Sequence, residues 1–190
     1  MRAVRYACAF TMAWAIAACG QQEPTALTDR DTPEIMLGDP GGGAVARVTG
    51  SGHVLRTAAG VSDVATFTFS AIHHADGTGS GQFQHNLTVV DVKFHGHVTC
   101  VTVAGNRGWI GGVIDRLESP DPADQSFVGT DVWWLVEDNG EGPNDPPDRT
   151  TSLLLTLPGT TITAASWCRD QPVPPVLLRP LVSGNIQVRN

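Results

Sequence analysis

The sequence predicts an all-β protein, built as an antiparallel β-barrel or β-sandwich of about eight to nine short strands. The composition indicates this class, because the 190 residues include 21 Gly and 13 Pro but only one Lys and five Glu. A helix bundle needs many more Glu and Lys residues on its surface. From residue 44 onwards apolar residues recur with a period of two, and turn-forming residues follow about every 8–12 positions. A single β domain over 44–190 accounts for these features.

The strand at 66–71 shows this period clearly, because Phe67, Phe69 and Ala71 alternate with Thr and Ser. Such alternation indicates a strand with one buried face. The next segment, 75–81, is rich in Gly, Asp and Ser, which supply the positive φ angles of a hairpin loop. The pattern resumes over 83–89, so the two segments predict a β-hairpin.

Residues 91–104 contain the longest regular alternation in the chain. One face has the residues Val92, Phe94, Gly96, Val98 and Cys100. The opposite face has Asp91, Lys93, His95, His97 and Thr99. An antiparallel sheet with one dry and one wet face has this pattern, which places Cys100 on the dry face.

The remaining strands are expected at 44–49, 52–57, 107–114, 131–137, 151–157, 160–166 and 185–189. Gly105 and Asn106 predict a turn, whereas Gly111 and Gly112 indicate a β-bulge or a close backbone contact. We expect the last strand to pair beside the first, because this pairing removes both edges of the sheet.

Residues 1–18 have the features of a secretory signal peptide. Arg2 and Arg5 precede thirteen uncharged, mostly apolar residues, a run too short to span a bilayer as a permanent helix. The run ends in Ile16-Ala17-Ala18-Cys19-Gly20, which resembles the lipobox of bacterial lipoproteins. The resemblance implies cleavage before Cys19, acylation of Cys19 and attachment to a membrane, and Gly20 implies the outer membrane if the cell has one. The alternative is an ordinary secretory signal in which Cys19 is incidental.

Residues 19–43 are expected to be a flexible tether. They contain several Gln, Pro and Gly residues and only one short apolar group, Ile35-Met36-Leu37. Such a segment buries too little apolar surface to order itself. It would therefore let the β domain stand away from the membrane.

The cysteine count agrees with export. Cys8 leaves with the signal peptide and Cys19 takes the lipid, so Cys100 and Cys168 remain. Two cysteines in an oxidising compartment favour a disulfide. A metal-binding pair or a catalytic thiol is the alternative, although neither residue has a CxxC partner or an adjacent His.

Two histidines are the first candidate metal ligands. His95 and His97 point to the same side of their strand and would hold zinc or copper, with His74 or Asp91 as a third ligand. The alternative is a solvated polar face on which the histidines simply lie.

The acidic loop 137–148 is the second candidate metal site. Hard oxygen ligands suit calcium, and the loop offers the carboxylates of Asp138, Glu141, Asp145 and Asp148. The order of these residues does not match an EF-hand. An ordinary solvated loop stiffened by proline is the alternative.

The adjacent residues Trp133 and Trp134 must point to opposite faces of their strand. One ring belongs in the core, and the other is a candidate contact for a sugar or peptide ligand. The alternative role for the outward ring is to cover a neighbouring strand.

The net charge excludes some classes of partner, and the sequence contains no motif that identifies an enzyme. The net charge of −7 and the absence of a basic patch exclude nucleic acid as a partner. No nucleophile motif is present, since the glycine-rich run 77–81 lacks the strand–elbow–helix setting.

Several runs in 44–190 are similar to a group of small bacterial exported β-proteins of uncharacterised function. The runs are 95–100, 105–112, 138–142 and 183–186. The resemblance implies the fold and a secreted location, and it transfers no catalytic residue.

The expected function is that of a lipid-anchored β-domain at the cell envelope, acting as a non-catalytic binding or structural module with a small-molecule or protein partner. Two alternatives stay open. One is a small β-barrel enzyme with a polar interior site around His73 and His85. The other is an envelope protein that binds calcium or zinc.

Overall fold

The computed structural model describes residues 43–190, apart from 59–60, 157–158 and 175–176. The expected signal peptide (1–18), Cys19 and the expected tether (19–43), except for Gly43, lie outside the described residues. In the part of the chain that the structure describes, none of the helices is long and apolar enough to cross a membrane.

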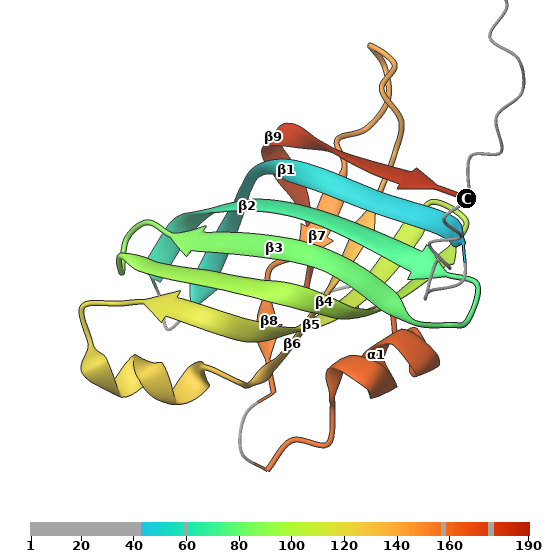
Figure 1. Ribbon diagram of the computed structural model, residues 1–190. Coiled ribbons are helices and arrows are strands. Elements are labelled where there is room, and N and C mark those ends of the chain that lie inside the picture. The colour runs from blue at the N-terminus through green and yellow to red at the C-terminus, as the bar shows by residue number, and fades with distance from the viewer. Residues whose placement is uncertain (1–42, 59–60, 157–158, 175–176) are drawn as a thin grey trace, which may run out of the picture. The chain divides into compact units, whose positions relative to one another are not determined.

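Nine antiparallel strands form one sheet that closes into a barrel (Figure 1). The strands are β1 (Ala44–Ala58), β2 (Val61–His74), β3 (Gly79–Leu87), β4 (Val92–Ala104), β5 (Arg107–Glu118), β6 (Asp131–Glu137), β7 (Arg149–Thr151), β8 (Leu154–Leu155) and β9 (Leu178–Arg189). Their order is β5-β4-β3-β2-β1-β9-β7-β6-β8, and β5 also pairs with β6. The predicted all-β fold is therefore confirmed, with a ring of strands rather than two packed sheets.

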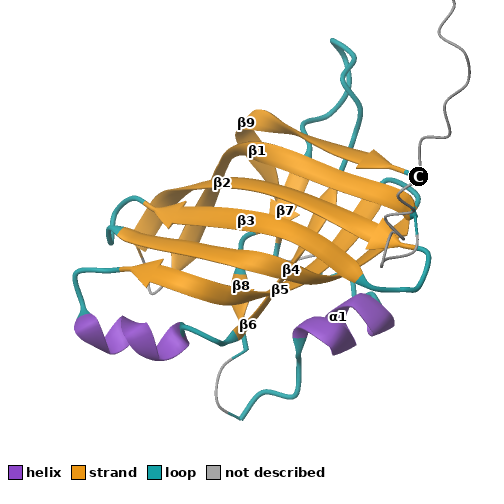
Figure 2. Cartoon of the chain, in the orientation of Figure 1, coloured by secondary structure: helices purple, strands orange, loops and turns teal. Residues whose placement is uncertain are grey.

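Two short helices complete the described elements. Figure 2 shows both on the same side of the strands in that view. They are the 3-10 helix η1 (Pro122–Phe127) and the α-helix α1 (Ala164–Asp170).

Local turn chemistry connects the long strands of the meander. In the β2–β3 loop the carboxylate of Asp76 accepts hydrogen bonds from the backbone and hydroxyl of Thr78, and Gly77 has a φ of 84°. Between β4 and β5, Gly105 adopts a φ of 61° next to Asn106. Glycine reaches such angles without steric cost, which is why these positions reverse the chain.

Apolar side chains from alternate strand positions fill the interior of the barrel. Its wall contributes aliphatic residues that are completely buried, such as Val48, Ile110 and Ile186. Near the centre, the Trp134 ring lies with its centroid 5.8 Å from that of Phe69 and 5.3 Å from that of Phe83. These edge-on contacts are favourable for aromatic rings.

A β-bulge in β4 corrects the predicted position of Cys100. The β4–β5 register shifts between Val98 and Cys100, so the residue after the bulge that enters the core is Val101. Cys100 instead faces α1 on the outside of the sheet and forms a disulfide with Cys168. The prediction of a disulfide is confirmed, whereas the predicted strand face is wrong. A bulge adds one unpaired residue and therefore reverses the alternation beyond it.

The close contact expected at Gly111 is present. A Cβ at Gly111 would lie 2.7 Å from Ala164 Cβ and 2.7 Å from Cys100 Sγ. Only a residue without a side chain lets α1 rest on β5 at this point.

The strand predicted at 160–166 is wrong, because α1 begins at Ala164. Thr163 and Ser166 form a reciprocal capping box at its N-terminus. Its buried residues, Ala164, Trp167 and Cys168, have helical spacing and pack against the outside of the barrel. The ring of strands closes without this segment.

The ends of the sheet pair as predicted. β9 runs antiparallel to β1, with Thr49 opposite Gln187 and Ser51 opposite Asn185. β1 continues across the expected break at Gly50, and β9 begins earlier than predicted. The segment 151–157 is divided between β7 and β8.

Candidate functional site

The interior of the barrel contains one deeply buried histidine. His85 on β3 is 5 % exposed, and its Nε2 atom has no hydrogen-bond partner among the described residues. A cavity of about 20 Å³ lies beside it, lined also by the aromatic rings of Phe67, Phe83 and Trp134 and by Thr150. A cavity of this size has room for about one water molecule.

Burial keeps the imidazole of His85 neutral. Desolvation, helped by the positive charge of Arg56, lowers the pKa of His85 from 6.5 to about 4. Arg56 lies on β1 at the inward parity of Val54 and directly opposite Asp63 of β2. Sequence reasoning missed Arg56, although its spacing of two from Val54 was the available signal.

The two histidines of the predicted interior site do not come together. His73 pairs with Gly79 on β3, whereas His85 pairs with Phe67 on β2. The two levels are six residues apart along β2, which corresponds to roughly 20 Å. The Nδ1 atom of His73 is also buried without a partner, but His85 alone borders the interior cavity.

His95 and His97 lie side by side along the outer face of β4, as their spacing predicted. The Nδ1 atom of His97 is 2.8 Å from Asp115 Oδ1. His95 Nε2 lies 3.6 Å from a carboxylate oxygen of Glu118. Among the described residues, no group of three or more His, Cys, Asp or Glu side chains is gathered closely enough to hold a metal ion.

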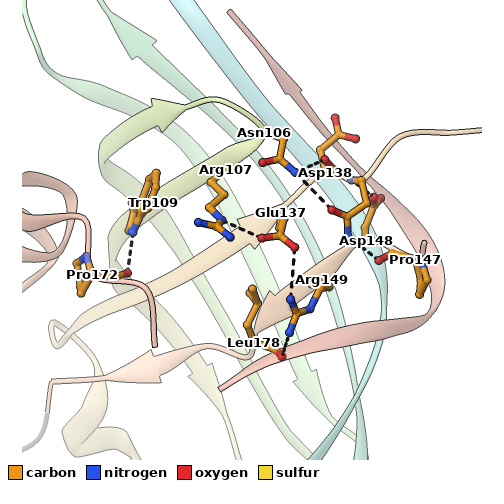
Figure 3. Close-up of polar contacts among 11 residues, drawn as sticks. Asn106, Arg107, Trp109, Glu137, Asp138, Pro147, Asp148, Arg149, Pro172 and Leu178 are labelled. Atoms are coloured by element: carbon orange, nitrogen blue, oxygen red, sulfur yellow. Dashed lines mark hydrogen bonds and ion pairs between the residues drawn. The ribbon is translucent and has the colours of Figure 1, made fainter. Parts of the chain in front are cut away.

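The acidic loop lies at one end of the barrel, where its first carboxylate bridges two arginines (Figure 3). Glu137 Oε2 accepts a hydrogen bond of 2.8 Å from Arg107 Nε, and Glu137 Oε1 lies 3.5 Å from Arg149 Nη1. Arg149 also donates to the backbone oxygen of Leu178 at 3.0 Å. The carboxylate of Glu137 is buried, so the two guanidinium groups balance its charge.

Two further carboxylates of this loop hold β9 in place. Asp148 is buried and accepts hydrogen bonds from the backbone N–H groups of Asn139, at 2.8 Å, and Ile186, at 2.7 Å. Asp138 Oδ2 accepts from the backbone N–H of Val188 at 2.9 Å. These contacts connect the loop to a strand more than thirty residues away, which gives the carboxylates a structural role.

The two exposed carboxylates of the loop also have N–H donors. Asp145 accepts from the backbone N–H of Gly142 at 2.7 Å. Glu141 accepts from the side-chain amides of Asn185 and Gln187, and these hydrogen bonds lower the pKa of Glu141. The predicted calcium ligands therefore lie in one loop, with hydrogen-bond donors at each of them.

The adjacent tryptophans point to opposite faces, as expected. Trp134 lies in the barrel core, with 5 % of its surface exposed. Trp133 faces outward, and its ring centroid lies 4.3 Å from that of Trp167 on α1. The α-helix thus covers the candidate ligand-contact ring on its outer side.

No protein-family model, curated protein or solved structure matches this chain. Two regions remain as candidates for binding: the small interior cavity beside His85 and the outer surface of the long strands.

Proposed function

We propose that the protein is an exported β-barrel module, held at the cell envelope by a lipid on Cys19, that acts there by binding or structural support. The observation that carries the proposal is the disulfide between Cys100 and Cys168. Disulfides of this kind form and persist in oxidising compartments and are rare in the cytosol. The signal-like N-terminus and the lipobox resemblance supply the route to the envelope.

The packing of the barrel supports a function on the surface rather than inside. Small-molecule sites in proteins have volumes of about 300–1,000 Å³. The cavity beside His85 has about 20 Å³, and aromatic and aliphatic side chains occupy the rest of that region. A partner is therefore expected on the outer face of the sheet.

The lipid anchor is tested by Cys19→Ser, with Cys8→Ser as the matched control. Cys8 lies within the expected signal peptide, so its replacement should change nothing in the mature protein. We expect the wild type and Cys8→Ser to incorporate labelled palmitate and to sediment with membranes. Cys19→Ser should lose both properties, because it removes the thiol that is acylated. A Cys19→Ser protein that retains the label and the membrane fraction would overturn the proposal.

A second candidate function is an interior site in a small-barrel enzyme. The unpartnered Nε2 of His85 favours it, because a buried polar atom without a partner is rare in proteins. The two functions differ in what His85→Gln does. A surface module should retain partner binding in this variant, whereas an interior enzyme should lose its activity.

A further inference from the structure

The middle of the outer face of three adjacent strands carries a group of uncharged hydrogen-bonding side chains. Strand register places six of them in two rows across β1, β2 and β3. We name this set the neutral polar face; its first row is Thr49, Ser70 and Gln82, and its second row is Ser51, Thr68 and Gln84. The next row has Thr66 on β2 and Asn86 on β3, with His53 opposite Thr66 on β1.

The side-chain donors and acceptors of the neutral polar face are not used within the described part of the chain. None of its six side chains makes a hydrogen bond or ion pair with another residue in the described part of the chain. Five of the six are exposed, and Thr49 is half-buried. This contrasts with the acidic loop, where each carboxylate has an N–H donor.

Shallow, open depressions lie over the face. Two hollows of about 430 Å³ each share Thr68 and Gln84 in their linings. A third, of about 280 Å³, also includes Thr68. The linings of the two larger hollows extend from Ser183 on β9 to Asp115 on β5, which at the usual strand spacing is about 24 Å along the sheet.

The chemistry of the face excludes several classes of partner. Its six side chains carry no charge, so an anionic polymer finds no cation there. They include no aromatic residue, whereas the centre of a protein–protein interface is rich in aromatic side chains. Hydroxyl and amide groups both donate and accept hydrogen bonds, and the hydroxyl groups of a sugar do the same.

We propose that the neutral polar face binds an uncharged, polyhydroxylated polymer, that is, a neutral polysaccharide. The length of the combined hollows calls for an oligomer rather than a single sugar. The inference deepens the function proposed above, on which it rests only for the location of the module at the envelope.

The test is affinity electrophoresis of the purified full-length protein in native gels that contain dextran, mannan or glucomannan, with anionic alginate as the charged comparison. We expect at least one neutral polysaccharide to slow the wild-type protein. The double variant Thr68→Val with Gln84→Glu should bind at least about tenfold more weakly, because it removes one hydroxyl and replaces the neutral amide of Gln84 with a carboxylate.

Thr99→Val is the matched control, since Thr99 is an exposed threonine of β4 outside these hollows. It should be slowed as much as the wild type, and all variants should melt within a few degrees of it. Migration unchanged by every neutral polysaccharide overturns the inference. Slowing only in alginate, or slowing that survives in the double variant, also overturns it. The Cys19→Ser experiment measures only membrane attachment, and the electrophoresis measures only polysaccharide binding. The lipid anchor and the polysaccharide site are therefore tested independently.

Discussion

Buried polar residues in this barrel are accommodated in two opposite ways. Asp148 remains a hydrogen-bond acceptor for two backbone N–H groups, and Glu137 lies between two arginines. His85 has no partner at Nε2, so it is held in its neutral form. A buried charged group is tolerated when it has a partner of opposite charge or hydrogen-bond donors. A buried titratable group without a partner instead shifts its pKa so that its neutral form is favoured.

His85 therefore makes stability depend on pH. The pKa of His85 is about 4 in the folded protein and close to 6.5 in the unfolded chain, so between these values only the unfolded chain binds the proton. The free energy of unfolding is therefore highest above pH 6.5 and decreases as the pH falls from 6.5 to about 4. The total decrease is about 3 kcal/mol. Urea unfolding at a series of pH values should show this loss in the wild type and not in His85→Gln.

The exposed His53 supplies the control for this measurement. His53→Gln replaces an imidazole whose Nδ1 contacts Ser183 on the outer face. It should retain the pH dependence of the wild type. Identical pH profiles for the wild type and His85→Gln would contradict the assignment to His85.

At the scale of elements, the acidic loop and α1 both stabilise the barrel from outside its strands. The loop supplies carboxylates to the backbone of β9, and α1 covers Trp133 and is bonded to β4 by the disulfide. A loop with this many carboxylates would repel itself if they were merely solvated. The N–H donors explain how the loop remains ordered.

Asp148→Ala tests whether the loop is structural or needs calcium. The variant leaves two backbone N–H groups without their acceptor, so we expect a loss of about 2 kcal/mol or more in the free energy of unfolding. The loss should be the same in EDTA and in excess Ca²⁺. Asp145→Ala, which removes one local contact of an exposed residue, should cost much less. A loss for Asp148→Ala that appears only when Ca²⁺ is present would instead identify a cation site.

At the scale of the whole molecule, strand pairing closes the ring and the disulfide joins it to the one α-helix of the described chain. Because β9 pairs with β1, neither strand leaves an unpaired edge where they meet. This pairing protects the barrel from edge-to-edge association. The two cysteines are 68 residues apart in the chain. A bond across so long a segment restricts the unfolded chain strongly.

The variant Cys100→Ala with Cys168→Ala measures this effect. In the chain-entropy model, a loop of this length contributes about 4 kcal/mol to the free energy of unfolding. For a domain of this size we expect the melting temperature to fall by about 10 °C. Reductant should lower the melting temperature of the wild type and leave that of the double variant unchanged. Equal stability of oxidised wild type and double variant would show that the bond contributes nothing.

The sequence by itself determined the features that depend on neighbouring residues. The period of two over 66–71 and the glycines of the hairpin loop predicted strands and turns correctly, because pleat and turn geometry are local. The disulfide followed from the count of cysteines. The spacing of His95 and His97 likewise placed both on one strand face.

Only the tertiary structure decided what depends on contacts between distant segments. The bulge before Cys100 reverses the side-chain alternation, and nothing in the local sequence marks it. The segment at 160–166 has a strand-like pattern, yet the closed ring leaves it no partner and Trp167 finds its contacts as part of a helix. The rows of the neutral polar face exist only because β1, β2 and β3 pair in one register. Register is set by the packing of the whole barrel, so side chains far apart in sequence come together only when the ring closes.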